Sequence, residues 1–213
     1  MPELSRRVQT FTDSVIRRMT RINNMTPGSI NLSQGFPDFD PPQEILDALK
    51  EAAEHGPHQY SITFGAKNFR DALAEMYTKK FAREIDPEKE IVVTCGGTEA
   101  MMAAMMTVCN PRDKVAVFSP FYENYGADAI LSGADPVYVP LVPPDFHYDS
   151  EALERAFQAG TKALILCNPS NPCGKVFTME EMEEIAELAK RYDAFVITDE
   201  VYEYIIYGEN RHI

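Results

Sequence analysis

The second half of the chain alternates between short apolar runs and segments with apolar residues at helical spacing. The apolar runs predict strands at residues 91–94, 115–117, 136–140, 163–167 and 194–198. The helical spacing predicts helices at residues 98–108, 122–132, 150–158 and 178–192. Alternating strands and helices are typical of a mostly parallel sheet with helices on both faces. We therefore predict an α/β fold, a three-layer αβα sandwich.

The first 90 residues have a different pattern. A weak amphipathic pattern in residues 1–26 predicts a short helix or an arm, and Gly and Pro residues in 27–42 predict a loop. Pro42 then opens a predicted helix with Ile45, Leu46 and Leu49 on one face, since Pro is favoured in the first helical turn. Helical spacing from Phe69 to Phe81 predicts a further helix.

Composition and charge exclude several classes of protein. The 213 residues carry a formal net charge of −13, which argues against nucleic acid or an anionic membrane as the main partner. No apolar run is long enough to span a bilayer, and no signal peptide is visible. The four cysteines form no C-x-x-C pair and the four histidines follow no metal-ligand spacing, so we expect a reduced, cytoplasmic protein without a metal site.

Polar residues follow the last two predicted strands. Asn171 follows the strand at 163–167, whereas Asp199 and Tyr202 follow the strand at 194–198. Ligands of open α/β sheets bind beyond the carboxyl ends of the strands, so we expect an amide, a carboxylate and a phenol to converge there. Pro169 and Pro172 restrict the backbone around Asn171. The simpler alternative is an Asp that caps a turn and a Tyr that belongs to the core.

Two further segments suit a cofactor. Gly96 and Gly97 lie between a predicted strand and a helix, where a tight turn and a helix N-terminus favour a phosphate; an ordinary turn is the alternative. The aromatic segment 119–125 can pack as core or present a flat face to a planar cofactor. The run 195–200 also resembles the strand tip of an NTPase, but the chain has no phosphate loop with Lys.

Five segments, in this order, resemble those of the pyridoxal-phosphate-dependent aminotransferases of fold type I, in the class I/II group that includes aspartate and kynurenine–glutamine aminotransferases. The segments are residues 31–39, 60–73, 95–100, 168–174 and 199–202. Each is a weak or moderate signal alone, whereas five in order are a strong one. The resemblance implies transamination between an L-amino acid and a 2-oxo acid, with pyridoxal 5′-phosphate as cofactor. It also implies a homodimer with shared active sites.

The resemblance implies roles for residues around the cofactor ring. Tyr122 would stack on the pyridine ring, and Asn171 and Tyr202 would bind its phenolic oxygen. Asp199 would pair with the ring nitrogen and keep it protonated, because an opposite charge favours the charged form. A protonated ring is the better electron sink.

The resemblance also implies roles at the phosphate and the substrate. Gly97 and Thr98 would hold the cofactor phosphate, and Tyr60 would reach the phosphate site of the other subunit. Gly35 would lie near the substrate carboxylate. Residues 1–42 would form an N-terminal arm and a substrate-side loop, part of a small domain, and residues 43–213 a cofactor-binding large domain that is incomplete at its C-terminus.

Two departures from the family pattern limit these expectations. Cys173 stands where the family usually has Thr. No segment matches the one that carries the family's Schiff-base lysine, and Lys162, Lys175 and Lys190 lie in other contexts. The catalytic residue is therefore unknown, and we expect the chain to hold the cofactor without catalysing the reaction alone. Two alternatives stay open, a lyase on the same scaffold and a non-catalytic fragment or cofactor-binding module.

Overall fold

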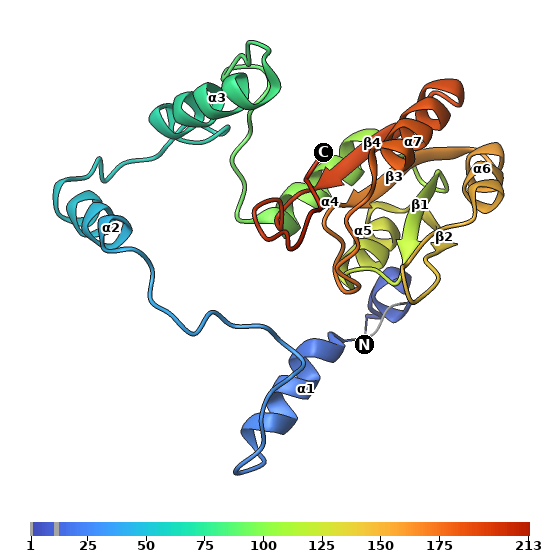
Figure 1. Cartoon of the computed structure of the whole chain (residues 1–213). Helices are drawn as coiled ribbons and strands as arrows, with labels where there is room; N and C mark the ends of the chain where they lie inside the picture. Colours follow the sequence, from blue (N-terminus) through green and yellow to red (C-terminus); the bar gives the residue numbers. More distant parts are fainter. Residues whose placement is uncertain (1, 11–12) are drawn as a thin grey trace. The chain divides into compact units, whose positions relative to one another are not determined.

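The computed structural model describes residues 2–10 and 13–213 (Figure 1). Its contacts divide the chain into two compact units. One unit contains residues 2–10 and 95–213, and the other contains residues 13–94. The first unit holds the whole sheet and is called the sheet unit below; the second is called the helical unit.

Four parallel strands form the sheet, in the order β2-β1-β3-β4. Their bounds are Lys114–Ser119 for β1, Asp135–Pro140 for β2, Thr161–Cys167 for β3 and Phe195–Asp199 for β4. These elements confirm four of the five predicted strands. The last residues of adjacent strands lie in register, Ser119 with Pro140 and Cys167 with Asp199. The carboxyl ends of the strands therefore meet along one edge of the sheet.

Helices cover both faces of the sheet, because alternate residues of a strand point to opposite faces. Val117 and Ile165 join a core with helices α4 (Gly97–Val108) and α5 (Asn124–Ser132). Phe118 and Leu164 join a second core with α6 (Ser150–Gln158) and α7 (Met179–Arg191). Residues 115–118 of β1 and 163–167 of β3 are apolar because both faces of these central strands are buried. The predicted three-layer αβα architecture is confirmed.

Local sequence fixes where the helices of the second core begin. Asp149 caps α6, where its carboxylate accepts a hydrogen bond from the Glu151 N–H. Thr178 and Glu181 form a capping box at the start of α7, in which each side chain accepts from the other residue's N–H. The predicted bounds of α6 are confirmed, whereas α5 begins at Asn124, two residues later than predicted.

The helical unit contains α1 (Val15–Asn24), α2 (Gln43–His55) and α3 (Lys67–Phe81), and a short 3₁₀ helix, Arg6–Gln9, belongs to the sheet unit. Pro42 is the N-cap of α2 and not part of its first turn. Among the described residues of these three helices, Arg70 and Ala74 alone are buried. The helical unit therefore has little core of its own.

The predicted strand at residues 91–94 is wrong. This segment has no ladder partner, and the Val93 N–H donates instead to the Phe64 carbonyl, 3.0 Å away. Gly65 lies against Val93 with φ +102°, and a Cβ at residue 65 would come within 2.5 Å of the valine side chain. The apolar run thus packs against the loop before α3 within the helical unit. A neighbouring strand, and not an apolar sequence alone, makes a segment part of a sheet.

No helix in residues 2–10 and 13–213 is long and apolar enough to cross a bilayer. The predicted domain boundary at residue 42 stays a prediction.

Candidate cofactor site

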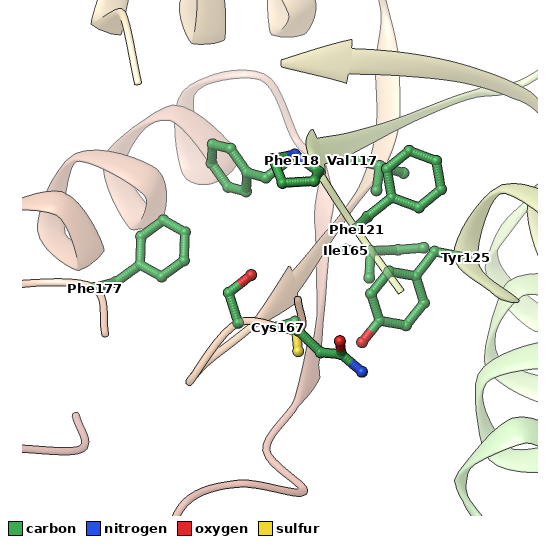
Figure 2. Close-up of a pocket in the computed structure, with 10 residues that line it drawn as sticks. Val117, Phe118, Phe121, Tyr125, Ile165, Cys167 and Phe177 are labelled. Carbon is green, nitrogen blue, oxygen red and sulfur yellow. The ribbon is translucent and has the colours of Figure 1, made fainter. Parts of the chain in front are cut away.

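The strand order reverses at the centre of the sheet. The chain leaves β1 through α5 on one face to reach β2, and it reaches β3 and β4 through α6 and α7 on the other face. The carboxyl ends of β1 and β3 therefore flank the topological switch point, where open α/β sheets bind ligands. A small pocket lies there, lined in part by Phe121, Tyr125, Cys167 and Asn171 (Figure 2).

Asp199 ends β4 beside this pocket and accepts two hydrogen bonds. The Tyr125 hydroxyl donates to Oδ2 at 2.7 Å, and the Val201 N–H donates to Oδ1 at 3.2 Å. Tyr125 is buried, and Figure 2 shows its hydroxyl directed toward the side of the pocket where Cys167 lies. Burial, and then the neighbouring Cys167 and Asp199, raise the pKa of the Tyr125 phenol far above its usual range. The phenol therefore stays a donor, and Asp199 is held as an acceptor.

Asn171 and Tyr202 meet at the ends of β3 and β4. The Asn171 amide donates to the Tyr202 hydroxyl oxygen across 3.4 Å, and both side chains are half-buried. The turn that carries Asn171 is held by its own backbone, since the Ser170 N–H donates to the Lys175 carbonyl at 2.8 Å. Cys173 packs against the core on the α6 and α7 face. An amide and a phenol are thus presented together, on a turn with fixed geometry.

The N-terminus of α4 is open and rich in glycine. Gly96 is its N-cap with φ +83°, and neither Gly96 nor Gly97 has another atom within 4 Å of where a Cβ would lie. The first N–H groups of a helix have no partner within the helix, and they carry partial positive charge. The Thr98 hydroxyl accepts from the Asn124 amide at 3.1 Å, which ties this end of α4 to the start of α5. Such an end suits a small anion.

Tyr122 lies two residues before the start of α5. Its ring meets the Tyr125 ring edge to face, with 5.7 Å between the ring centroids and 79° between the planes. Tyr122 is half-buried and packs against the core on the α4 and α5 face. A rigid aromatic residue thus stands beside the phenol that holds Asp199.

Two predicted site residues belong to the helical unit. Tyr60 and Gly35 are both exposed there, and Tyr60 is as exposed as a side chain can be, at 101%. Arg70, from the same sequence segment as Tyr60, is fully buried and donates to the Gly65 carbonyl and to the Glu88 carboxylate, each at 3.1 Å. The structure brings together Tyr122, Asn171, Asp199 and Tyr202 in the sheet unit, and the roles of all predicted site residues stay predictions.

Two contacts of the site come from residues to which the sequence analysis gave no role. Tyr125 binds Asp199, and Asn124 binds Thr98. Both residues follow β1 in the aromatic segment that could pack as core. Tyr122 and Tyr125 are three residues apart, which puts both on one side at the start of a helix. This spacing was the feature of the sequence that could have indicated a role for Tyr125.

His212 also had no predicted role, and the structure places it beside Glu200. The imidazole Nε2 lies 3.5 Å from a Glu200 carboxylate oxygen. Ligand atoms of Glu200, Glu203 and His212 lie within 4.8 Å of one another. The prediction that the chain has no metal site stays a prediction.

Similarity to known proteins defines the class. The family model for aminotransferase class I and II matches residues 27–213. The chain belongs to this family of fold-type I aminotransferases, which confirms the resemblance predicted from the five segments.

Individual relatives agree with this assignment. The chain is 38% identical over 209 residues to a probable N-succinyldiaminopimelate aminotransferase of Mycobacterium tuberculosis, which covers 97% of this chain and 52% of the relative. It is 35% identical over 220 residues to kynurenine–oxoglutarate transaminase 3 of Rattus norvegicus, which covers 98% of this chain and 48% of the relative. The chain thus spans about half the length of the curated relatives it matches.

Solved structures give the same result. An N-succinyldiaminopimelate aminotransferase from Mycobacterium tuberculosis superposes with a TM-score of 0.92 and 37% identity, over 99% of this chain and 55% of that one. An aspartate aminotransferase from Thermus thermophilus, solved with maleate, superposes with a TM-score of 0.91 and 32% identity, over 100% of this chain and 57% of that one. The solved structures thus agree with the family model, which matches residues 27–213.

Proposed function

We propose that this chain provides the cofactor-binding part of a pyridoxal-phosphate-dependent aminotransferase, which transfers an amino group between an L-amino acid and a 2-oxo acid. The observation that carries the proposal is the set of polar groups at the switch point of the sheet. A carboxylate, an amide with a phenol, and an open helix N-terminus come from the ends of three neighbouring elements. Pyridoxal phosphate has one matching group for each of them.

Each polar group of the site can bind one part of pyridoxal phosphate. The Asp199 carboxylate is an acceptor that suits a protonated ring nitrogen. Asn171 and Tyr202 offer an amide N–H and a hydroxyl to the phenolic oxygen. The N–H groups of Gly97 and Thr98 suit a phosphate, and the space around Gly96 and Gly97 leaves room for it. Tyr122 offers a flat aromatic face.

The residues of this chain would act mainly by charge and position. When bound, pyridoxal phosphate supplies an electron sink for the electron pair left as the substrate loses its Cα proton. Asp199 keeps the ring nitrogen protonated because a negative charge nearby favours the positive form. Asn171 and Tyr202 orient the ring through its phenolic oxygen. Gly97 and Thr98 fix its phosphate end.

The identity of the reaction rests on the relatives. The names of the matched proteins describe them as aminotransferases or transaminases, acting on N-succinyldiaminopimelate, kynurenine, aromatic amino acids or aspartate. We propose transamination on this ground. The site residues described above govern the cofactor, and they are equally compatible with elimination on the same scaffold, for which no feature of the structure argues.

Partners and location complete the proposal. We propose a homodimer in which Tyr60 reaches the phosphate site of the other subunit and Gly35 lies near the substrate carboxylate. Both residues are exposed in their own unit, which is compatible with contacts to a second subunit. We also propose a cytoplasmic location, since Cys95, Cys109, Cys167 and Cys173 are unpaired, as expected in a reducing compartment.

An equilibrium titration with pyridoxamine 5′-phosphate tests the cofactor site. This form of the cofactor needs no covalent bond to the protein. We expect saturable binding at one site per chain, and we expect Asp199→Asn to weaken it by about 100-fold, because the variant loses a charge-assisted contact. Asp193→Asn is the matched control, since Asp193 is exposed in the turn after α7 with φ 51°, a conformation that Asn tolerates.

Two outcomes would contradict this proposal. One is a folded wild-type chain that binds no pyridoxamine phosphate, and the other is equal weakening by Asp199→Asn and by the control. Intact mass after borohydride treatment with pyridoxal phosphate tests the expectation that the chain alone is inactive. A stoichiometric adduct that maps to one lysine would overturn that expectation.

A further inference from the structure

We propose that Tyr125 is a positioning residue, whose hydroxyl holds the Asp199 carboxylate in place as the acceptor for the ring nitrogen of the cofactor. The inference rests on the function proposed above and adds a residue to its site. Tyr125 comes from the start of α5 and Asp199 from the end of β4, which are 74 residues apart in the sequence. Their contact joins two elements at the edge of the sheet where the cofactor would bind.

Tyr125 is held firmly enough to position another group. Its side chain is 3% exposed, and its ring packs edge to face on Tyr122. Its own N–H donates to the Tyr122 carbonyl at 3.0 Å, which fixes the backbone at the start of α5. A phenol on a buried, packed ring has little rotational freedom. The 2.7 Å hydrogen bond to Asp199 Oδ2 therefore fixes the carboxylate as well.

The two donors to Asp199 leave it capacity for a ligand. Tyr125 binds one oxygen and the Val201 N–H binds the other. An ionised carboxylate has about four acceptor positions, so each oxygen can still accept another hydrogen bond. The two donors therefore orient the Asp199 carboxylate and leave some of its acceptor positions open for a ligand.

The chemical nature of the donors also matters. A phenol and a backbone N–H are neutral, so they stabilise the carboxylate without cancelling its charge. Among residues 2–10 and 13–213, no ammonium, guanidinium or imidazole lies within 4.0 Å of the Asp199 carboxylate. The full negative charge is therefore available to a protonated ring nitrogen, whose charged form it favours. A Lys or Arg in the place of Tyr125 would compete with that ring.

The donor role of Tyr125 does not depend on pH in the working range. Burial, followed by the nearby Cys167 and Asp199, raises the pKa of the phenol well above its usual range. The hydroxyl thus stays a hydrogen-bond donor near neutral pH. Cys167 in turn donates from its thiol to the Pro169 carbonyl at 3.3 Å, in the turn that carries Asn171.

The chain offers a matched control for this contact. Tyr148 is also buried, at 8% exposure, and its hydroxyl donates to the Glu184 carboxylate at 2.8 Å. Tyr148 belongs to the core on the α6 and α7 face of the sheet, and Glu184 lies in α7. Tyr125→Phe and Tyr148→Phe each remove one hydroxyl that binds a carboxylate. A general loss of stability would affect both variants, whereas a role toward the cofactor concerns Tyr125 alone.

The test uses the whole 213-residue chain with pyridoxamine 5′-phosphate as the probe. We expect Tyr125→Phe to weaken binding about tenfold and Tyr148→Phe to change it less than about twofold. A second readout is the pH at which the ring nitrogen of the bound probe loses its proton, followed by ultraviolet absorbance. We expect this pH to fall in Tyr125→Phe and to stay at the wild-type value in Tyr148→Phe.

Three results would overturn the proposed role of Tyr125. Wild-type affinity and a wild-type titration of the ring nitrogen in Tyr125→Phe would overturn the role of Tyr125 while leaving the proposed function intact. Equal effects in both variants would show a structural role only, which also overturns it. A folded wild-type chain that binds no probe would overturn the proposed function and this inference together. Urea unfolding of each variant establishes that the chain is folded in every titration.

Discussion

The sheet unit and the helical unit place their apolar side chains in opposite ways. Val115, Leu164 and Ile165 in the central strands are at most 1% exposed, because helices cover both faces. In the helical unit, Leu32 is 91% exposed and Ile30 is 82% exposed. The helices of the sheet unit therefore cover the apolar residues of its central strands, whereas the helical unit leaves much of its apolar surface uncovered. Exposed apolar surface of this kind is typical of interaction sites.

The residues proposed for the cofactor ring and those proposed for the second subunit differ in the same way. Asp199, Asn171, Tyr202 and Tyr122 each contact another residue of the sheet unit. Tyr60 has no such support in the helical unit and is fully exposed. The residues for the cofactor ring are positioned by the core, and the residues proposed for the second subunit and the substrate are not.

The largest expected effect comes from the same substitution in the two units. Leu164→Ala removes a fully buried side chain from β3 and should lower the free energy of unfolding by about 3–4 kcal/mol. Leu32→Ala is the control, because an exposed leucine should cost less than about 0.5 kcal/mol. Urea unfolding followed by circular dichroism measures both. Equal losses in the two variants would break the contrast between the units.

A smaller effect concerns a charge buried in the sheet unit. Asp128 in α5 is 5% exposed, and burial raises its pKa to about 6. Its Oδ2 has no hydrogen-bond partner among the described residues. The folded state thus binds this proton more tightly than the unfolded chain, whose Asp titrates near 4. The resulting stability is present below about pH 4 and is lost as the pH rises to about 6.

Asp128→Asn tests whether Asp128 lowers the stability of the protein as the pH rises. The variant should be more stable than the wild type at pH 8, by at most about 3 kcal/mol, because Asn carries no charge to bury. The advantage should shrink as the pH falls from about 6 to about 4. Unfolding free energies of both proteins across this range give the difference at each pH. A constant difference would show that Asp128 is not the group that titrates.

The capping box of α7 gives a smaller effect again. Thr178→Ala removes the side chain that accepts from the Glu181 N–H, and it should cost about 1 kcal/mol of stability. Thr178→Ser keeps the hydroxyl and should retain most of the stability. Thermal unfolding of the three proteins measures the series. A Ser variant as unstable as the Ala variant would assign the effect to the methyl group and not to the cap.

The smallest effect on stability is expected at Tyr60. Because its side chain is fully exposed, Tyr60→Phe should change the free energy of unfolding by less than about 0.5 kcal/mol. If Tyr60 serves the site of a second subunit, the variant should bind pyridoxamine phosphate more weakly only at protein concentrations where the chain dimerises. Titrations at several protein concentrations, with sedimentation of the same samples, measure this. A loss of affinity in the monomer would contradict the role across subunits.

Much of the sheet unit could be predicted because its elements follow local rules. The strands of the sheet are short apolar runs, and the predicted bounds of α6 are those observed. The segment 91–94 has the same apolar pattern, but it packs on Gly65 and Phe64 and has no adjacent strand. Strand formation depends on a partner, which the sequence of one segment does not contain.

The site could be predicted in part for the same reason. Asn171 and Asp199 follow apolar strands, so their positions at the edge of the sheet follow from the pattern and from strand order. The contact between Tyr125 and Asp199 joins residues 74 positions apart. It depends on where the start of α5 lies relative to the end of β4, which no local pattern specifies. From the sequence alone, Tyr125 therefore could not be distinguished from an aromatic residue of the core.

The pairing of Asp199 with the cofactor ring is tested by the protonation state of the ring nitrogen in the bound cofactor. Pyridoxamine 5′-phosphate labelled with ¹⁵N in the ring reports by its chemical shift whether that nitrogen is protonated. We expect a protonated ring at pH 8 in the wild-type chain and a neutral ring in Asp199→Asn, because only the carboxylate favours the charged form. The same shift in both proteins would contradict the pairing of Asp199 with the ring.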